Sequence, residues 1–464
     1  MPDLAASFAN EGTEAIMNKK RVVITGLGVA TPVGIGIDET FDALVEKKSG
    51  VRRIEAFDPS SFASQVGGEI HELNVGDFIF KKYKRLAKVM ARDIELAVAA
   101  AYLAIRDGGL KSKCLVERGE ADAVNIDSTR FGANIGAGLI CADLSELAEA
   151  LSKAAENPED RGNRRFSLSK WGEAMRNLTP LWLLKFLPNM LACHVTIVHD
   201  CQAPSNTITC GEASSHLAIG EAFRTIQRGA ADICICGGAE SKINPMALLR
   251  PALWGRMATN RNDAPAQACR PFDSDRGGMV VGEGGGLLIL EEYEHAKARG
   301  AKIYGEVCGF GASQNNSNWF KPQADGRALR IAAEKAMADA GVKTDEIDVL
   351  NPFGVGTREH DAGEAAAIRT MFGARTSQIP VIATKGAIGN NGAGSGAIDI
   401  AVVVKAMERG VAPPSLNTDT LDPDCDINVI RNDPIDLRAK TALTFAGAMS
   451  GGQTGALVIR RIES

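Results

Sequence analysis

The stretch Asn206–Phe223, NTITCGEASSHLAIGEAF, predicts a strand that turns sharply into a helix. Residues 206–209 contain the β-branched side chains typical of a strand. Residues 212–228 predict a helix, with Gly229 as a typical stop. Its apolar face is formed by Ile219, Ala222, Phe223 and Ile226. Strand-to-helix units of this kind are the elements of α/β folds.

The corner between the two elements holds Cys210, Gly211 and Glu212. A group at the start of a helix meets the positive end of the helix dipole and free backbone N–H groups, so an anion is favoured there. A cysteine in this place becomes a better thiolate, and a glutamate stays ionised. Cys210 and Glu212 are therefore both candidates for the reactive group.

Strand-like and helix-like segments alternate along the rest of the chain, which predicts an α/β fold. Residues 21–28 and 280–292 are apolar, glycine-bounded runs typical of buried strands. Residues 83–109 predict one long amphipathic helix that ends at Gly108. A new strand–helix series begins at residues 301–313.

The length of 464 residues is too great for one ordinary core and indicates two large halves. We place them at residues 20–294 and 295–464, after a tail at residues 1–19. Residues 142–178 are polar and charged, and we interpret them as a surface insertion in the first half. No signal peptide is visible in residues 1–16.

Net charge and cysteine usage narrow the possible functions. A net charge of −5 gives no indication of binding to nucleic acid or to a membrane surface. The ten cysteines are scattered, and several lie in apolar runs, which suits reduced thiols in a cytoplasmic protein. Cys234 and Cys236 could face one metal, but no second Cys or His pair accompanies them, so we predict packing and no metal site.

Four segments together resemble the elongating type II β-ketoacyl-acyl carrier protein synthases of the condensing-enzyme family. They are RVVITGLGVATPVG (21–34), RMATNRNDAPAQACRPFDSDRGGMVVGEGGGLLILEE (256–292), TKGAIGN (384–390) and SGGQTGALVI (450–459). The resemblance runs from about residue 20 to residue 462, apart from the insertion. It implies a thiolase-like α/β fold with two pseudo-equivalent halves in αβαβα layers, and a place in fatty-acid or polyketide biosynthesis.

Members of this family carry a nucleophilic cysteine at the corner, a fixed distance before an Ile-Gly pair. Counting back from Ile219 and Gly220 puts that position at Glu212. A two-residue shift of register would instead make Cys210 the nucleophile, but it requires an insertion in the first helical turn.

The resemblance also locates two catalytic histidines, and neither is present. Their positions hold Phe353, in NPFGVGT, and Asn390, in KGAIGN, whereas Lys385 is retained. The gating phenylalanine of the C-terminal loop aligns with Ser450. The loops that carry the catalytic groups thus survive while the groups themselves are replaced.

These replacements remove the chemistry of condensation. A glutamate cannot carry an acyl chain as a stable thioester, phenylalanine has no hydrogen-bond donor, and asparagine donates but cannot be charged. We expect Glu212 to form an ion pair with Lys385, or a hydrogen-bonded chain to it through Asn390, because a buried charge requires a partner. His216 is expected to pack or meet solvent. His360 is expected to lie at the surface, with a place in the pocket as the alternative.

The resemblance to chain-length factors implies a non-condensing subunit that forms a homodimer, or a heterodimer with an active ketosynthase. Acyl carrier protein is the implied partner, with its phosphopantetheine as a substrate arm and no cofactor of the chain's own. Arg250, Arg256 and Arg261 are candidates for a basic docking patch. Four alternatives remain: a malonyl-carrier-protein decarboxylase, an active synthase using Cys210, an unrelated acid–base reaction at Glu212, and a carrier-binding scaffold without a ketosynthase partner.

Overall fold

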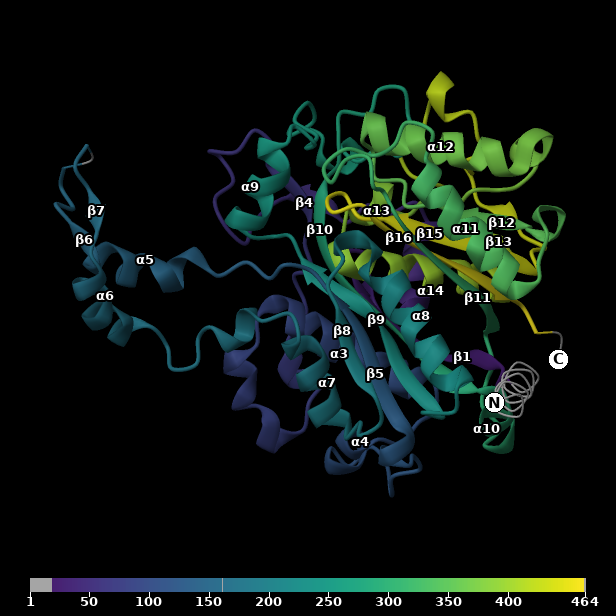
Figure 1. Cartoon of the computed structure of the whole chain (residues 1–464), viewed down its shortest axis with the longest axis horizontal. Helices are drawn as coiled ribbons and strands as arrows, with labels where there is room; N and C mark the ends of the chain where they lie inside the picture. Colours follow the sequence, from purple (N-terminus) through teal and green to yellow (C-terminus); the bar gives the residue numbers. More distant parts are fainter. Residues whose placement is uncertain (1–18, 161, 463–464) are drawn as a thin grey trace, which may run out of the picture.

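The computed structural model describes residues 19–160 and 162–462 (Figure 1). The expected tail therefore lies outside the described residues, apart from Lys19. The strands are β1 (Val22–Thr31), β2 (Gly34–Ile35), β3 (Val51–Arg53), β4 (Val66–Gly68), β5 (Phe131–Ala137), β6 (Ala155–Glu156), β7 (Arg165–Phe166), β8 (Ser205–Ile208), β9 (Ile233–Ser241), β10 (Val281–Glu292), β11 (Gly305–Gln314), β12 (Val349–Asn351), β13 (Val411–Ala412), β14 (Ile435–Asp436), β15 (Thr441–Gly447) and β16 (Gln453–Arg460).

The α-helices are α2 (Ile37–Val45), α3 (Arg92–Asp107), α4 (Lys113–Glu117), α5 (Leu144–Lys153), α6 (Leu168–Ala174), α7 (Met190–His199), α8 (Ser214–Gln227), α9 (Pro245–Leu253), α10 (Tyr293–Ala298), α11 (Arg327–Ala340), α12 (Arg358–Phe372), α13 (Lys385–Ile388) and α14 (Ser395–Arg409). The long helix expected over residues 83–109 begins only at Arg92. Before it, Lys81–Tyr83 and Leu86–Val89 form two separate 3₁₀ turns.

The main strands form one hydrogen-bonded path in the order β12-β15-β16-β11-β1-β10-β9-β5-β8. Strands from the two halves of the sequence meet where β1 pairs antiparallel with β11. The strands on one side of this pairing, β1, β10, β9, β5 and β8, form a first group, in which β5 runs parallel to both β9 and β8. The strands on the other side, β11, β16, β15 and β12, form a second group, in which β12 runs parallel to β15. The mixed sheet confirms the predicted α/β class.

Helices form layers on and between the two groups of strands. In Figure 1, α8 and α14 lie in the middle of the molecule, where α8 contacts β9 and β16 and α14 contacts β10 and β15. On the outer sides, α3 and α7 pack on the first group, and α11 packs on the second. This arrangement is the αβαβα layering of a thiolase-like fold, as predicted.

Glycines in β1 allow the outer helix α3 to approach very closely. A Cβ atom at Gly28 would lie 2.1 Å from the carbonyl oxygen of Ala100, and one at Gly26 would lie 2.3 Å from that of Ala104. Both alanines are fully buried in the alanine-rich α3. Small residues on both elements therefore set the spacing of this layer.

One segment leaves the body of the molecule. Residues 144–186, which include most of the segment interpreted as an insertion, form an arm with α5, α6 and the β6–β7 hairpin (Figure 1). Its own small core consists of Ala150, Ala154, Ala174 and Leu178, packed with Leu147, Trp171 and Trp182. The arm is thus a folded unit that projects from the first half.

The remaining sequence expectations concern membranes and metals. Across residues 19–160 and 162–462, no helix is long and apolar enough to span a bilayer. The same residues contain no group of acidic, His and Cys side chains arranged for a metal ion. Cys234 and Cys236 are fully buried in β9, which confirms that they pack in the interior.

Candidate functional site

The strand-to-helix corner exists as predicted, with slightly different limits. β8 ends at Ile208, a 3₁₀ turn spans Gly211–Ala213, and α8 follows directly. Gly211 turns the chain with φ 55°, a left-handed conformation that favours glycine. The Cys210 amide donates to the hydroxyl of Ser214, at 2.8 Å, and so ties the end of β8 to the start of α8.

Glu212 points inward from this corner and is only 5% exposed. One carboxylate oxygen lies 3.4 Å from the Lys242 ammonium and 3.2 Å from Nδ2 of Asn390, which donates to it. The other oxygen accepts a 3.0 Å hydrogen bond from the backbone N–H of Met449. Both oxygens of the carboxylate are therefore satisfied inside the protein.

The surroundings keep Glu212 ionised. Burial alone raises the pKa of this carboxyl, but the Lys242 charge and the donors Met449 and Asn390 outweigh burial, so its pKa lies below the usual value. The pKa of Lys242 is lowered by burial and raised more strongly by Glu240 and Glu212, and the net change is upward. A stable ion pair thus occupies the corner.

Lys242 bridges two carboxylates. Its ammonium lies 3.1 Å from Glu240, at the end of β9, as well as 3.4 Å from Glu212. Glu240 in turn accepts a 2.7 Å hydrogen bond from the N–H of Ala393, in the loop that leads into α14. The sequence analysis missed Lys242. The only indication in the sequence is that Lys242 directly follows a buried strand and lies two residues after Glu240.

The expected ion pair between Glu212 and Lys385 is wrong. Lys385 is fully buried and pairs instead with Asp399 on α14, which also accepts a hydrogen bond from Thr384. Asp399 comes fourteen residues after Lys385, one helix further on. The expected contact between Glu212 and Asn390 is correct, but Asn390 does not extend it to Lys385.

Phe353 and Asn390, the residues at the two expected histidine positions, are both enclosed by the protein. Phe353 is 2% exposed, packs in an apolar cluster with Met279 and Met449, and its backbone N–H donates to Glu364 at 2.8 Å. Asn390 is fully buried. Its Nδ2 also lies 3.5 Å from the sulfur of Met279, and its oxygen accepts from the N–H of Gly392 at 3.0 Å.

A cavity of about 470 Å³ opens beside the corner. Its lining includes Cys210, Glu212, Lys242, Trp254, Arg256, Trp319, Met449 and Ser450. Cys210 therefore lies at the cavity wall and Ser450 lies in the loop that borders it. Burial raises the pKa of the Cys210 thiol, so it is a weaker nucleophile at neutral pH than an unperturbed cysteine.

Arg256 closes one side of this cavity and is not part of a surface patch. Its guanidinium is buried, donates to the carbonyl oxygens of Met449 and Phe320, and lies 5.1 Å from the Trp254 ring and 4.9 Å from the Phe320 ring. Met449 thus connects Glu212, through its N–H, to Arg256, through its C=O.

The other two arginines of the expected basic patch are also engaged. Arg250 donates to the Leu139 carbonyl oxygen, at 3.3 Å, and to the Cys141 sulfur. Arg261 forms an ion pair with Asp275. A single exposed basic face formed by Arg250, Arg256 and Arg261 is therefore not present.

The expectation for His360 is also corrected. This side chain is buried beside a second, small cavity, and its Nδ1 lies 2.8 Å from the Thr357 hydroxyl. Burial and the Arg256 charge lower its pKa to about 4, so the ring is neutral. His216 is buried as expected for a packing role, with Nε2 3.1 Å from the Thr444 hydroxyl.

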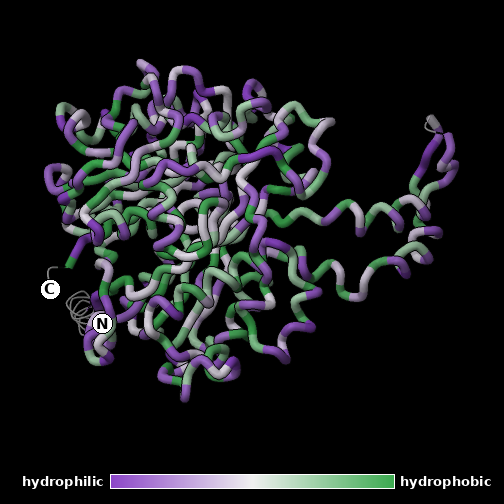
Figure 2. Tube along the Cα trace, turned by 180° about the vertical axis from the view of Figure 1, so that it is seen from behind, coloured by the Kyte–Doolittle hydropathy of each residue, from purple (hydrophilic) through white to green (hydrophobic). Residues whose placement is uncertain are grey.

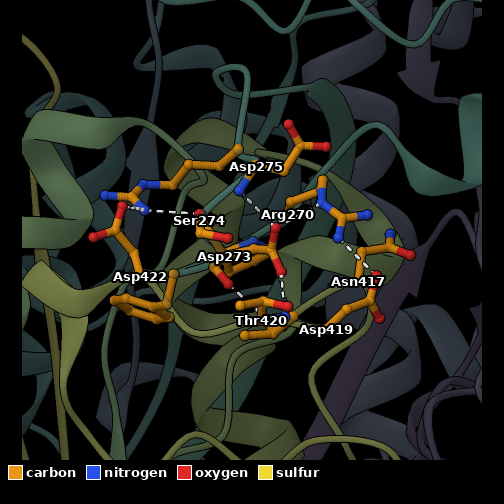
Figure 3. A network of polar contacts seen from close by, with 12 residues as sticks. Arg270, Asp273, Ser274, Asp275, Asn417, Asp419, Thr420 and Asp422 are labelled. Carbon is orange, nitrogen blue, oxygen red and sulfur yellow. Dashed lines mark hydrogen bonds and ion pairs between the residues drawn. The ribbon is translucent and has the colours of Figure 1, made fainter.

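The long signature segment holds the loops around the site in place. In Figure 3, Asp273 accepts hydrogen bonds from the Arg270 side chain, at 3.0 Å, and from the backbone of Thr420, at 2.8 Å. Arg270 also pairs with Asp419 at 2.7 Å. Next to this network, Asp361 accepts the N–H groups of Phe272, Val355 and Gly356. Asp361 therefore connects the loop that follows Phe353 to Phe272 in the signature segment.

Comparison with known proteins agrees with this fold. The chain matches the β-ketoacyl synthase N-terminal domain over residues 19–296 and the C-terminal domain over residues 304–419. It is 34% identical, over 94% of its length and 97% of the relative's, to a 3-oxoacyl-[acyl-carrier-protein] synthase 2 from Synechocystis sp.. The chain therefore belongs to the β-ketoacyl synthase family.

Two solved structures are similar over 96% of this chain and the whole of theirs. One is a type II polyketide synthase acyl-carrier protein in complex with its ketosynthase, with a TM-score of 0.81 and 28% identity. The other is the ishigamide ketosynthase/chain length factor, with a TM-score of 0.80 and 26% identity. The neighbours thus include a ketosynthase bound to a carrier protein and a chain-length-factor system.

Proposed function

We propose that this protein is a non-condensing, chain-length-factor-like subunit of fatty-acid or polyketide biosynthesis, which works with an active ketosynthase and an acyl carrier protein. The observation that carries the proposal is the Glu212 carboxylate at the nucleophile corner, ion-paired with Lys242 and hydrogen-bonded by Asn390 and Met449. A carboxylate held in this way is a weak nucleophile, and it cannot carry an acyl chain as the thioester that a cysteine forms.

The donors that condensation requires are also occupied. The oxygen that develops charge during acyl transfer needs free N–H donors aimed at it. In this site the Met449 N–H and the Asn390 amide both donate to Glu212. The side chain of Phe353 contributes no donor. The loss of nucleophile and donors together leaves little condensing activity.

The first test is intact-mass spectrometry of the protein after incubation with malonyl- and acyl-carrier protein. We expect the masses of both proteins to stay unchanged. Conversion of malonyl- to acetyl-carrier protein would identify a decarboxylase. An acyl adduct mapped to Cys210 would identify an active synthase with a shifted register.

Two variants make the result specific. Cys210→Ser removes the rival nucleophile and is expected to change nothing. Glu212→Gln removes the negative charge while keeping the shape, and releases Lys242 from one of its two carboxylates. Decarboxylation that appears only in Glu212→Gln would show that the carboxylate itself suppresses the reaction.

The second part of the proposal concerns assistance to a partner. Active ketosynthase and carrier protein would be assayed with and without this chain, and the length of the acyl products measured. We expect the added chain to change the product length. Products of identical length and amount, at saturating concentrations of the chain, would contradict a chain-length-factor-like role.

A further inference from the structure

A second large cavity, of about 800 Å³, lies at the root of the arm. Its walls come from the body and from both stems of the arm, which Figure 2 shows leaving the same side of the body. At the end of β9, Glu240 and Lys242 line the corner cavity, whereas Ser241 between them lines this one. Because side chains alternate along a strand, the two cavities lie on opposite sides of this segment.

The wall of this cavity contains a buried acid with a free oxygen. Asp93, in the first turn of α3, lines the cavity although it is only 4% exposed. Its Oδ1 accepts a hydrogen bond from the Ser241 N–H at 3.3 Å. Within residues 19–160 and 162–462, no other residue donates a hydrogen bond to this carboxyl, and no cation pairs with it. Since buried polar groups normally have hydrogen-bond partners, the second oxygen is available to a ligand in the cavity.

Negative charge is in excess around Asp93. Burial, and then the charges of Glu240 and Glu283, raise the pKa of Asp93 to about 8. The two neighbouring cations already pair with the other acids: Arg92 lies 3.0 Å from Glu283, and Lys242 lies 3.1 Å from Glu240. Three buried carboxyl groups therefore share two cations, and a third cation would complete the balance of charge.

The lysine and the arginine of the cavity wall are not available to an anion. The Arg92 guanidinium donates to two carboxylates and to the carbonyl oxygens of Ile70 and Leu73. Lys185 pairs with Glu146 on the other stem of the arm. An anionic ligand would thus have to displace an existing contact, whereas a cation would not.

The rest of the wall suits the carbon part of a ligand. Phe57, Met90, Phe186 and Ile243 line the cavity. Aromatic rings attract ammonium groups through their faces. A metal ion fits less well, because the described residues contain no group of side chains arranged to hold one.

We propose that this cavity binds a small organic cation, an alkylammonium, whose nitrogen donates to the free oxygen of Asp93 while its carbon chain lies against Phe57 and Phe186. An ammonium group has three N–H donors and no acceptor, which matches a carboxyl group without a cation. The inference does not rest on the proposed function, since these three residues lie outside the corner cavity.

The test is isothermal titration calorimetry of the full chain with propylammonium chloride in mildly alkaline buffer. We expect saturable binding at one site per chain, and none with propan-1-ol or with sodium chloride at the same concentration. The variant Asp93→Asn keeps the shape of the side chain and is expected to weaken binding at least about tenfold, because it loses a charged hydrogen bond. The matched control Asp122→Asn changes a side chain that is 80% exposed outside the cavity and is expected to bind as the wild type does.

Three outcomes of the titration would overturn the proposal. They are the absence of saturable binding, equal affinity in Asp93→Asn, and equal binding of propan-1-ol, which would show an apolar pocket with no role for the charge. Thermal melting followed by circular dichroism checks that Asp93→Asn is folded. The amide resembles the protonated carboxyl that the raised pKa favours at neutral pH, so we expect the melting temperature to stay close to that of the wild type.

The pH dependence of binding gives an independent readout. At neutral pH most of the Asp93 carboxyl is protonated, and the ammonium must displace that proton. Affinity is therefore expected to rise about tenfold or more from about pH 6.5 to about pH 9, a range in which an alkylammonium stays charged. The other charged and titratable groups of the cavity wall and its borders are Glu69, His71, Arg92, Glu95, Cys141, Asp143, Lys185, Glu240, Lys242, Arg250 and Glu283. A pH dependence that persists in Asp93→Asn would belong to one of these groups and would overturn the role of Asp93.

Cysteine labelling locates the ligand. Cys141 lies in the wall of this cavity, and Cys210 lies in the wall of the corner cavity. We expect propylammonium to slow the modification of Cys141 by a thiol reagent and to leave that of Cys210 unchanged, as measured by peptide mapping. Protection of Cys210 without protection of Cys141 would place the cation at the corner and would overturn the proposal.

Discussion

Two buried pairs of lysine and acid lie near one another in this protein, and they differ in what surrounds them. Lys385 and Asp399 are 0% and 2% exposed, so this pair is buried away from solvent. Lys242 and Glu212 line a cavity, with 14% and 6% of their side chains exposed. The first pair connects α13 to α14, and the second connects the corner to the end of β9.

The comparison separates a pair that connects elements of the fold from a pair that faces the cavity. Lys385 pairs with Asp399, and its ammonium lies 5.2 Å from the centre of the Phe353 ring, so it connects the loops on either side of it. The Glu212 pair lies at the strand-to-helix corner, where the sequence analysis expects the reactive group of the family. The first pair is therefore part of the supporting structure, whereas the second lies at the wall of the cavity.

The largest expected effect is on the enclosed pair. Lys385→Met leaves Asp399 buried without its cation, and removal of one partner of a buried pair costs about 3–5 kcal/mol of unfolding free energy. Burial already raises the pKa of Asp399 and Lys385 lowers it, so the variant drives the carboxyl toward its neutral form. Chemical denaturation at neutral pH measures the loss.

The control for this prediction is the double variant Lys385→Met/Asp399→Leu. An apolar pair of similar size often replaces a buried ion pair at little cost. We expect it to recover more than half of the stability lost in the single variant. If the double variant is as unstable as Lys385→Met, the pair is not the cause of the loss.

A smaller effect is expected at the cavity pair. Lys242→Met removes the cation between Glu212 and Glu240, and we expect a loss of about 2 kcal/mol, because charged hydrogen bonds contribute about 1.5–3 kcal/mol and the cavity admits some screening. A double-mutant cycle with Glu212→Gln measures the coupling between the two side chains. A coupling of zero would show that they do not interact in solution.

The family and the corner could be predicted from the sequence because they depend on local patterns. The apolar face of Ile219, Ala222, Phe223 and Ile226 fixes the helix, and counting from Ile219 places Glu212 at the corner. The structure puts Glu212, Asn390 and Phe353 around one buried centre, as those motifs imply. The number of residues between two positions of a motif is given by the sequence and does not depend on tertiary contacts.

Partners brought together by tertiary structure could not be predicted in this way. Lys242 reaches Glu212 from the end of β9, which β5 separates from β8 in the sheet, and Asp399 reaches Lys385 from α14, beyond the motif. Arg256 looked like a surface cation, but two carbonyl groups and two aromatic rings surround it. The pairing of charged side chains depends on tertiary contacts, which a linear sequence pattern does not contain.

A pH series separates the two pairs further. The folded-state pKa of Glu212 is lowered below 4.5, so its carboxylate adds stability above about pH 4.5, and this contribution is lost as the pH falls through the folded-state pKa. We expect Glu212→Gln to be less stable than the wild type at pH 7 and the difference to shrink in acid. Melting temperatures from pH 7 to pH 3 check this. A constant difference would contradict it.

The smallest effect is expected from Arg256→Lys, which keeps the charge but cannot donate to both carbonyl groups in the same planar geometry. We expect a loss of about 1 kcal/mol, the typical net contribution of a hydrogen bond. Because Arg256 links Met449 to Phe320 at the cavity wall, we also expect faster labelling of Cys210 by a thiol reagent, measured by peptide mapping. Cys308, which lies outside this cavity, provides the internal control, since its labelling rate is expected to stay the same. Equal acceleration at both cysteines would mean that the variant loosens the whole fold, and an unchanged rate at Cys210 would mean that Arg256 does not close the cavity.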